Sequence, residues 1–168
     1  MNKDFEYWVQ KLEMLPHPEG GFFKESYRSH GLIPKNCLGT EYQGDRNYST
    51  AIYFLLSREN FSAFHRIASD ELWHFYAGDG LDIHILHTNG EYECIHLGNG
   101  EKENQVFQAM VPAGAWFASE TSNKNSWGLV GCTVAPGFDF QDFEMAKRED
   151  LVDKYPQQLE LITRLCRD

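Results

Sequence analysis

Between residues 20 and 136 the chain is a series of short segments rich in aromatic and β-branched residues, separated by glycine, asparagine and aspartate. Segments of this kind, repeated at intervals of about 8–12 residues, are typical of the strands of a β-sandwich or β-barrel. Asn89-Gly90, between two of the segments, predicts a β-hairpin. The pattern restricts most of the chain to an all-β fold.

The two ends of the chain have a different pattern. Apolar residues recur at helical spacing before Pro16, which ends that pattern. After residue 136 the sequence becomes charged and helix-prone. We predict a single domain over residues 1–168, made of a helix at 3–15, a barrel at about 20–136 and a helical segment at about 137–168.

Composition and charge argue against several classes of protein. The 25 acidic and 15 basic side chains give a formal net charge of −10, whereas nucleic acids and anionic lipids bind through clustered Lys and Arg. No apolar run approaches the ~18–20 residues of a membrane span, and the acidic N-terminus does not resemble a signal peptide. We therefore expect a cytoplasmic protein with reduced cysteines and with neither nucleic-acid nor membrane partners.

Residues 61–78 carry the side chains best suited to chemistry. If 61–67 and 71–77 are strands, alternation directs His65 toward one face of the first strand and Glu71 toward one face of the second. Chain order then makes the two residues neighbours inside a barrel. Imidazole titrates near neutrality and a nearby carboxylate can orient it, so such a pair can exchange protons with a ligand.

This segment resembles the first motif of the cupin superfamily, G-x5-H-x-H-x3/4-E-x6-G. His65, Glu71 and Gly78 match the motif, whereas Glu59 replaces its first glycine and Ile67 replaces its second histidine. The chain therefore keeps one imidazole and the carboxylate of the motif and lacks its second imidazole.

The second cupin motif, G-x5-P-x-G-x2-H-x3-N, is matched only in its centre, at Pro112 and Gly114. Val106 replaces its glycine, Thr121 replaces its asparagine, and Phe117 stands where the motif has a metal-binding histidine. The donor that this motif would supply to a metal is therefore missing.

Three further stretches sharpen the resemblance: HPEGGFFKESYRS at 17–29, FHRIASDELWHFYAG at 64–78 and LVGCTVAPGFDFQDFEMA at 129–146. With them, nearly the whole chain is similar to one branch of the superfamily, the cupin_5-like family, whose members are largely of unknown function. The resemblance implies a double-stranded β-helix (jelly-roll) barrel with short helices at both ends, a pocket inside the barrel and a homodimer.

The resemblance does not imply a complete metal site. A typical cupin site offers three imidazoles and a carboxylate, and Ile67 and Phe117 occupy two of those positions here. Catalytic metal sites usually have at least three protein ligands, so we expect no metal and no other cofactor. A divalent ion held by His65 and Glu71 alone is the weaker alternative.

Three functions stay open at this stage. The first is a metal-independent epimerase or isomerase that acts on a sugar-like or carbonyl compound through His65 and Glu71, by analogy with metal-free sugar-nucleotide epimerases of the superfamily. The second is a non-catalytic module that binds a small-molecule ligand. The third is a metal-dependent enzyme with an incomplete ligand set. His65 and Glu71 can also be interpreted as a purely structural pair.

Aromatic and first-strand residues are expected to line the pocket. The predicted lining consists of Tyr53, Ile67, Trp73, Phe75, Phe117, Tyr27 and Arg28. For Arg28 two interpretations stay open, a contact with an anionic substrate and a solvated surface position. Three histidines of one predicted hairpin, His84, His87 and His96, are interpreted as part of a solvated sheet surface, and His74 as a packing or interface residue.

Overall fold

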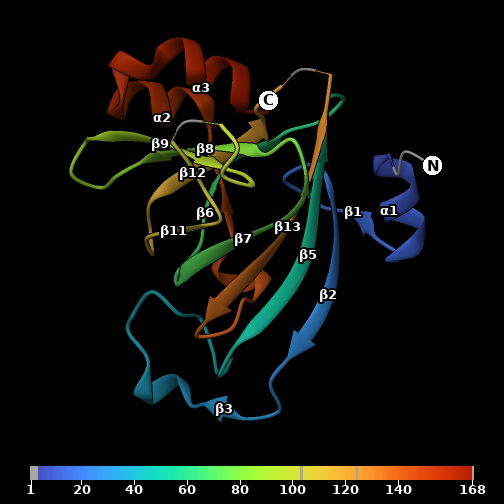
Figure 1. Cartoon of the computed structure of the whole chain (residues 1–168). Helices are drawn as coiled ribbons and strands as arrows, with labels where there is room; N and C mark the ends of the chain where they lie inside the picture. Colours follow the sequence, from blue (N-terminus) through green and yellow to red (C-terminus); the bar gives the residue numbers. More distant parts are fainter. Residues whose placement is uncertain (1–3, 103, 124, 168) are drawn as a thin grey trace.

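Two six-stranded sheets pack face to face in the computed structural model of the chain (Figure 1), which describes residues 4–102, 104–123 and 125–167. From residue 50 to residue 145 most connections cross from one sheet to the other, and only the three successive strands between residues 81 and 106 lie in the same sheet. This winding confirms the predicted jelly-roll barrel.

The first sheet has the strand order β1-β2-β5-β13-β7-β11, and its neighbouring strands are antiparallel. In that order its strands are Leu15–Pro16, Phe22–Arg28, Thr50–Ser57, Trp127–Ala135, Asp70–Gly78 and Gln108–Val111. The long central strands of this sheet provide most of the inner surface on which a ligand site can be built.

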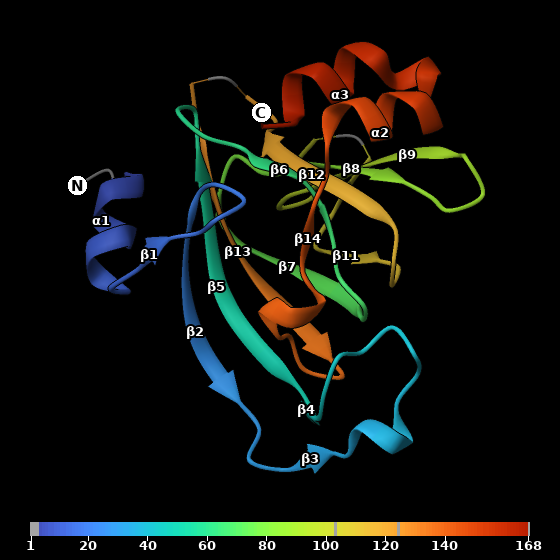
Figure 2. The same cartoon turned by 180° about the vertical axis from the view of Figure 1, so that it is seen from behind.

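The second sheet has the order β10-β9-β8-β12-β6-β14, and only its β10–β9 pair is parallel. In that order its strands are Gln105–Val106, Tyr92–Leu97, Leu81–Leu86, Trp116–Thr121, Ser62–Arg66 and Glu144–Met145. The predicted hairpin is confirmed as the β8–β9 pair, in which Gly90 adopts a positive φ of 94°. A small ribbon, β3 (Leu32–Ile33) with β4 (Arg46–Asn47), extends from one end of the barrel (Figure 2).

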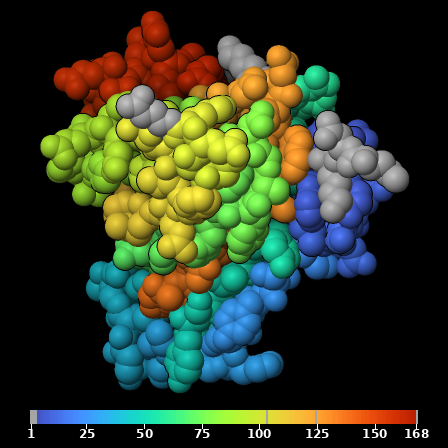
Figure 3. Space-filling model, in the orientation of Figure 1, coloured from blue at the N-terminus to red at the C-terminus, as the bar shows by residue number. Residues whose placement is uncertain are grey.

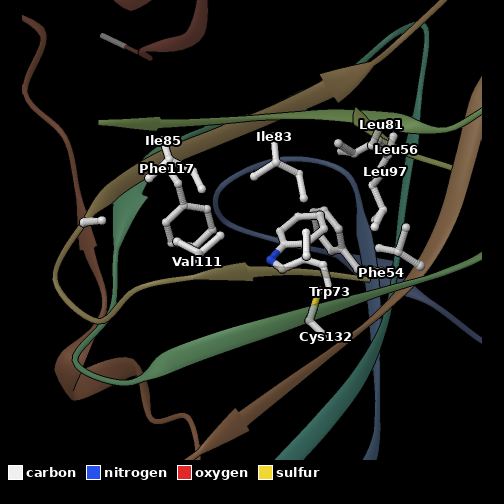
Figure 4. Close-up of a cluster of buried hydrophobic side chains, with 13 residues drawn as sticks. Phe54, Leu56, Trp73, Leu81, Ile83, Ile85, Leu97, Val111, Phe117 and Cys132 are labelled. Atoms are coloured by element: carbon white, nitrogen blue, oxygen red, sulfur yellow. The ribbon is translucent and has the colours of Figure 1, made fainter. Parts of the chain in front are cut away.

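Apolar side chains from both sheets fill the barrel interior (Figure 4). Alternation along β8 shows how the sequence produces this core. Ile83 and Ile85 point inward and are fully buried, whereas His84 between them points to the outer face. Phe54, Trp73 and other aromatic residues complete the interior and leave room for a cavity at one end.

The N-terminal helix is shorter than predicted. Asp4 caps α1 (Phe5–Lys11), and the helix stops before residue 15 because Glu13 adopts a left-handed conformation with a φ of 52°. Lys3, where the predicted helix begins, lies outside the described residues. The apolar face of α1 packs on Leu55 and Leu129, on the outer surface of the first sheet.

The C-terminal segment is only partly helical. Residues 137–147 form a loop with one 3-10 turn, η2 (Phe140–Asp142), and then strand β14, because Met145 pairs with His65 at the edge of the second sheet. The helices α2 (Arg148–Lys154) and α3 (Leu159–Leu165) follow and cover the outer face of that sheet. Figure 3 shows these helices in red at the top and the N-terminal helix in blue at the side. None of the helices in the described part of the chain has the length and hydropathy that a membrane crossing requires.

Candidate functional site

A cavity of about 200 Å³ opens at one end of the barrel interior. Strands β2, β5, β7 and β13 form one side, β6 forms the other, and two loops complete it. The lining residues are His17, Glu19, Phe23, Glu25, Arg28, Thr50, Ile52, Phe54, His65, Ile67, Glu71, Trp73, Cys132, Val134, Phe138, Asp139 and Phe140. The cavity therefore combines apolar walls with a few titratable groups, as is usual for small-molecule sites.

His65 is held rigidly in this cavity. It is 2% exposed, and its ring packs against Phe117 with centroids 4.0 Å apart. Its Nδ1 lies 2.7 Å from the carbonyl oxygen of Ala63, and because a carbonyl can only accept, Nδ1 carries the proton. Burial lowers the pKa of His65 to about 3, so the imidazole is neutral and its Nε2 is an acceptor.

The partner of that acceptor is Glu19, whose Oε2 lies 3.0 Å from His65 Nε2. Burial and the negative charge of Glu71 raise the pKa of Glu19 well above its usual value. Glu19 is therefore a neutral carboxylic acid that donates its proton to His65. The hydroxyl of Ser62 donates to the other Glu19 oxygen at 2.9 Å, and the three side chains form one hydrogen-bonded chain.

The local sequence explains how Glu19 reaches this position. Gly20 and Gly21, which follow it, have positive φ values of 118° and 72°. A Cβ at Gly20 would lie 2.0 Å from the carbonyl oxygen of Phe61. Only glycine permits this close approach to β6, where Glu19 also accepts a backbone hydrogen bond from Ala63.

His17 is the second imidazole of the cavity. Its Nδ1 lies 3.4 Å from Glu19 Oε2, and its ring packs between Phe23 and Phe140. Burial lowers the pKa of His17 to about 4. Both imidazoles of the cavity are therefore uncharged at neutral pH.

Glu71 lies in the same cavity but apart from this chain of side chains. It is 8% exposed, and burial raises its pKa to about 7, a rise that the neighbouring Cys132 thiol and Trp73 indole limit. Among the described residues no basic side chain forms an ion pair with it. The expected pairing of His65 with Glu71 is thus replaced by His65 with Glu19, because β6 and β7 belong to different sheets and contribute to opposing walls.

Of the other predicted pocket residues, Ile67, Trp73 and Arg28 line the cavity. Phe117 supports it from behind the His65 ring, and Phe75 packs against the core.

The two predicted tyrosines lie outside the cavity. Tyr53 sits between the inward-facing Ile52 and Phe54, so it points to the outer face of β5, where it contacts Tyr76 with centroids 6.0 Å apart. Tyr27 is 55% exposed, since the β2–β5 register shifts between residues 25 and 27 and turns it away from the interior.

Glu19 and His17 are the residues that sequence reasoning missed. Their stretch, HPEGGFF, contributes to the family resemblance but is assigned no site residue by the sequence alone. The sequence does contain a carboxylate directly before two consecutive glycines, a pattern that indicates close approach of two backbone segments. The pattern does not show which strand the glycines approach.

The side chains present do not fit a conventional cupin metal centre. Both ring nitrogens of His65 already have hydrogen-bond partners, and Ile67 and Phe117 offer no donor atoms. In the described ranges no group of three or more His, Cys, Asp or Glu side chains is arranged to hold a metal ion. The groups in the cavity that can exchange protons are its carboxyl and imidazole side chains.

Outside the cavity, His84 differs from its interpretation as a solvated residue. It is 6% exposed, and its ring nitrogens contact the Tyr92 hydroxyl at 2.9 Å and Glu120 Oε1 at 3.2 Å. Arg164 of α3 pairs with the same Glu120 carboxylate. The cluster therefore ties α3 to the outer face of the second sheet.

The remaining predicted histidines occupy less buried positions. His87 pairs with Glu93 at 2.8 Å and His96 with Asp82 at 2.9 Å, both at the protein surface. His74 is half-buried on the face of β7 that points away from the cavity. All four cysteines are free thiols.

Comparisons with known proteins agree with this architecture. A hypothetical protein from Leishmania major superposes with a TM-score of 0.89 and 32% identity, over 98% of this chain and 99% of its own. A protein of Shewanella oneidensis gives a TM-score of 0.87 and 35% identity, over 98% of each chain. An uncharacterized protein of Saccharomyces cerevisiae is 31% identical over 151 residues, which cover 84% of this chain and 75% of the yeast protein.

More distant likenesses concern the fold alone. Oxalate decarboxylase from Bacillus subtilis superposes with a TM-score of 0.54 at 12% identity, over 89% of this chain and 36% of that enzyme. The family model of Cupin_5, described as cupin superfamily (DUF985), matches residues 6–146. With the jelly-roll winding and full-length relatives at about one third identity, this match shows that the chain belongs to the Cupin_5 family of the cupin superfamily.

Proposed function

We propose that this protein is a metal-independent isomerase or epimerase of a small carbonyl compound, with Glu71 as the base and the Glu19–His65 pair as the acid. One observation carries the proposal: two buried carboxyl groups share one cavity, and only Glu19 is hydrogen-bonded to an imidazole. Burial raises the pKa of both groups, that of Glu71 to about 7 and that of Glu19 well above its usual value. Two carboxyl groups in unlike environments within one site are typical of acid–base catalysis.

The reaction follows from these states. The Glu71 carboxylate removes a proton from the carbon next to the carbonyl, and the C–H electron pair becomes the C=C bond of an enol. The carbonyl oxygen receives a proton from the Glu19–His65 pair at the same time. For inversion, the enol turns its other face to Glu71, which returns the proton to the carbon, while the enol hydroxyl gives its proton back to the Glu19–His65 pair. For an α-hydroxy carbonyl compound, Glu71 can instead return the proton to the former carbonyl carbon, and the neighbouring hydroxyl gives its proton to the Glu19–His65 pair as it becomes the new carbonyl. A base that titrates near the working pH suits this exchange.

The walls of the cavity support the same conclusion. Phe54, Trp73 and Val134 exclude water from the titratable groups, and exclusion of water strengthens electrostatic interactions with a developing enolate oxygen. The same apolar walls favour a second function, a binding module that holds a small ligand without changing it.

Proton exchange with solvent separates the two functions. The protein is incubated in D₂O with small aldoses, ketoses and cyclic ketones, and proton NMR follows the signals next to each carbonyl. We expect the wild type to replace these protons by deuterium, and Glu71→Gln to abolish the replacement. Exposed Glu59 offers a matched control, because Glu59→Gln removes the same charge far from the cavity.

Exchange that survives in Glu71→Gln would refute the assigned base. A compound that raises the melting temperature of the wild type without exchanging any proton would favour the binding module.

A further inference from the structure

Arg28 is the one arginine among the described lining residues. Most of its guanidinium N–H groups already donate hydrogen bonds within the protein. Its Nε and Nη2 donate to the Glu25 carboxylate, with an Nη2–Oε2 distance of 2.7 Å. Its Nη1 donates to Asn47 Oδ1 at 2.8 Å and to the carbonyl oxygen of Phe138 at 3.2 Å. A single Nη2 hydrogen is left over, and a bidentate grip on a ligand carboxylate or phosphate needs two aligned N–H groups.

The rest of the lining supplies no free positive charge. His17 and His65 are neutral at physiological pH because burial disfavours their charged forms. Asp139 adds negative charge toward the exposed end of the cavity, where Glu25 and Arg28 neutralise each other, and Glu71 adds it inside when ionised. An anionic ligand would therefore lose its hydration and meet carboxylates without gaining a cationic partner.

The size of the cavity limits the ligand further. Its volume of about 200 Å³ lies below the ~300–1,000 Å³ of drug-sized pockets. A phosphate or a second ring would have to lie at the Glu25 end, where Arg28 is occupied. The enclosed space suits one small, uncharged molecule.

We infer that the cavity selects small uncharged carbonyl compounds and excludes carboxylates and phosphate esters, and that Glu25 sets this preference by occupying Arg28. The inference rests on the proposed function for the choice of a carbonyl compound. It replaces the expectation that Arg28 binds an anionic substrate. Glu25 is a specificity-determining residue in this scheme, since it acts on the ligand through Arg28.

The test uses two compounds of nearly equal size, acetophenone, which is neutral, and benzoate, which is an anion. Methyl signals of Ile52, Ile67 and Val134, which line the cavity, report binding by NMR. We expect wild-type protein to bind acetophenone at least tenfold more tightly than benzoate. In Glu25→Gln, which frees Arg28, we expect benzoate affinity to rise at least tenfold and acetophenone affinity to stay within twofold.

Two controls assign the effect to Arg28. The double variant Glu25→Gln/Arg28→Gln should lose the gain in benzoate affinity. Glu13→Gln, which removes an exposed carboxylate paired with Lys24 at 3.4 Å, should leave both affinities unchanged. The inference is overturned if benzoate binds the wild type as tightly as acetophenone, if Glu25→Gln gains nothing, or if neither compound binds at millimolar concentration.

The outcomes also separate this inference from the proposed function. If acetophenone binds more tightly than benzoate but no compound exchanges protons in D₂O, the inference about charge selection stands and the proposed catalysis is refuted. If the wild type exchanges protons of a phosphorylated or carboxylate compound for deuterium, the proposed catalysis stands and the inference about charge selection is refuted.

Discussion

Replacing Glu71 by glutamine should stabilise the protein above neutral pH and leave its stability almost unchanged in acid. Burial raises the pKa of Glu71 from 4.5 to about 7, so the folded state holds this proton over a pH range in which the unfolded state has released it. Stability contributed by the protonated carboxyl is full below pH 4.5 and is lost as the pH rises through 7. Glutamine imitates the protonated carboxyl and has no proton to lose.

The size of the effect follows from that pH window. Each pH unit between the two pKa values is worth about 1.4 kcal/mol, so the loss across the window is about 3 kcal/mol. We therefore expect the free energy of unfolding of Glu71→Gln to exceed that of the wild type by about 3 kcal/mol at pH 8. The difference should approach zero near pH 4.5.

Urea denaturation at a series of pH values measures this difference directly, because the other titrating groups are common to both proteins. Glu59→Gln provides the matched control, since Glu59 is exposed and its variant should follow the wild type at every pH. A difference between Glu71→Gln and wild type that does not change with pH, or that favours the wild type at pH 8, would refute the argument. If Glu71→Gln is more stable than the wild type and no longer exchanges substrate protons in D₂O, Glu71 serves function at a cost in stability.

Three further perturbations test other parts of the structure. Burial lowers the pKa of His84, but contacts with Cys94 and the Glu120 carboxylate outweigh it and raise the pKa to about 9. His84→Gln should therefore lower stability by about 3 kcal/mol at pH 6 and by little at pH 10, as urea titrations would show. Gly21→Ala should cost more stability than Gly114→Ala, although both glycines have a positive φ, because a Cβ at Gly21 would lie 2.6 Å from a backbone oxygen and one at Gly114 would meet open space. Equal melting temperatures of the two variants would contradict this. Arg46 and Asp142 form a buried ion pair at 2.5 Å, so Arg46→Met alone should cost about 3 kcal/mol and the double variant Arg46→Met/Asp142→Leu distinctly less, measured by thermal unfolding.

Much of the fold follows from local physical chemistry that can be read along the chain. Strand alternation and turn residues predict the barrel, since a strand with one buried face needs apolar side chains at every second position. The same alternation directs His65 and Glu71 toward the interior, and the cavity contains both. The homodimer and the cytoplasmic location stay predictions.

The partners inside the cavity depend on contacts that no local pattern specifies. Glu19 meets His65 from 46 positions away in the sequence because a glycine turn approaches β6. Tyr27 turns outward because the β2–β5 register shifts beside it. Residues 144–145 form a strand and not a helix because β14 pairs with the edge of β6.

The sequence by itself therefore determined the barrel, its family and two of the polar groups that face its interior. Only the tertiary structure decided that the pKa of Glu19 is raised well above its usual value, that the pKa of Glu71 lies near 7 and that Arg28 is occupied by Glu25. The physical reason is that alternation depends on neighbours within one strand. Protonation and hydrogen-bond occupancy depend on burial and on charges brought together from distant segments.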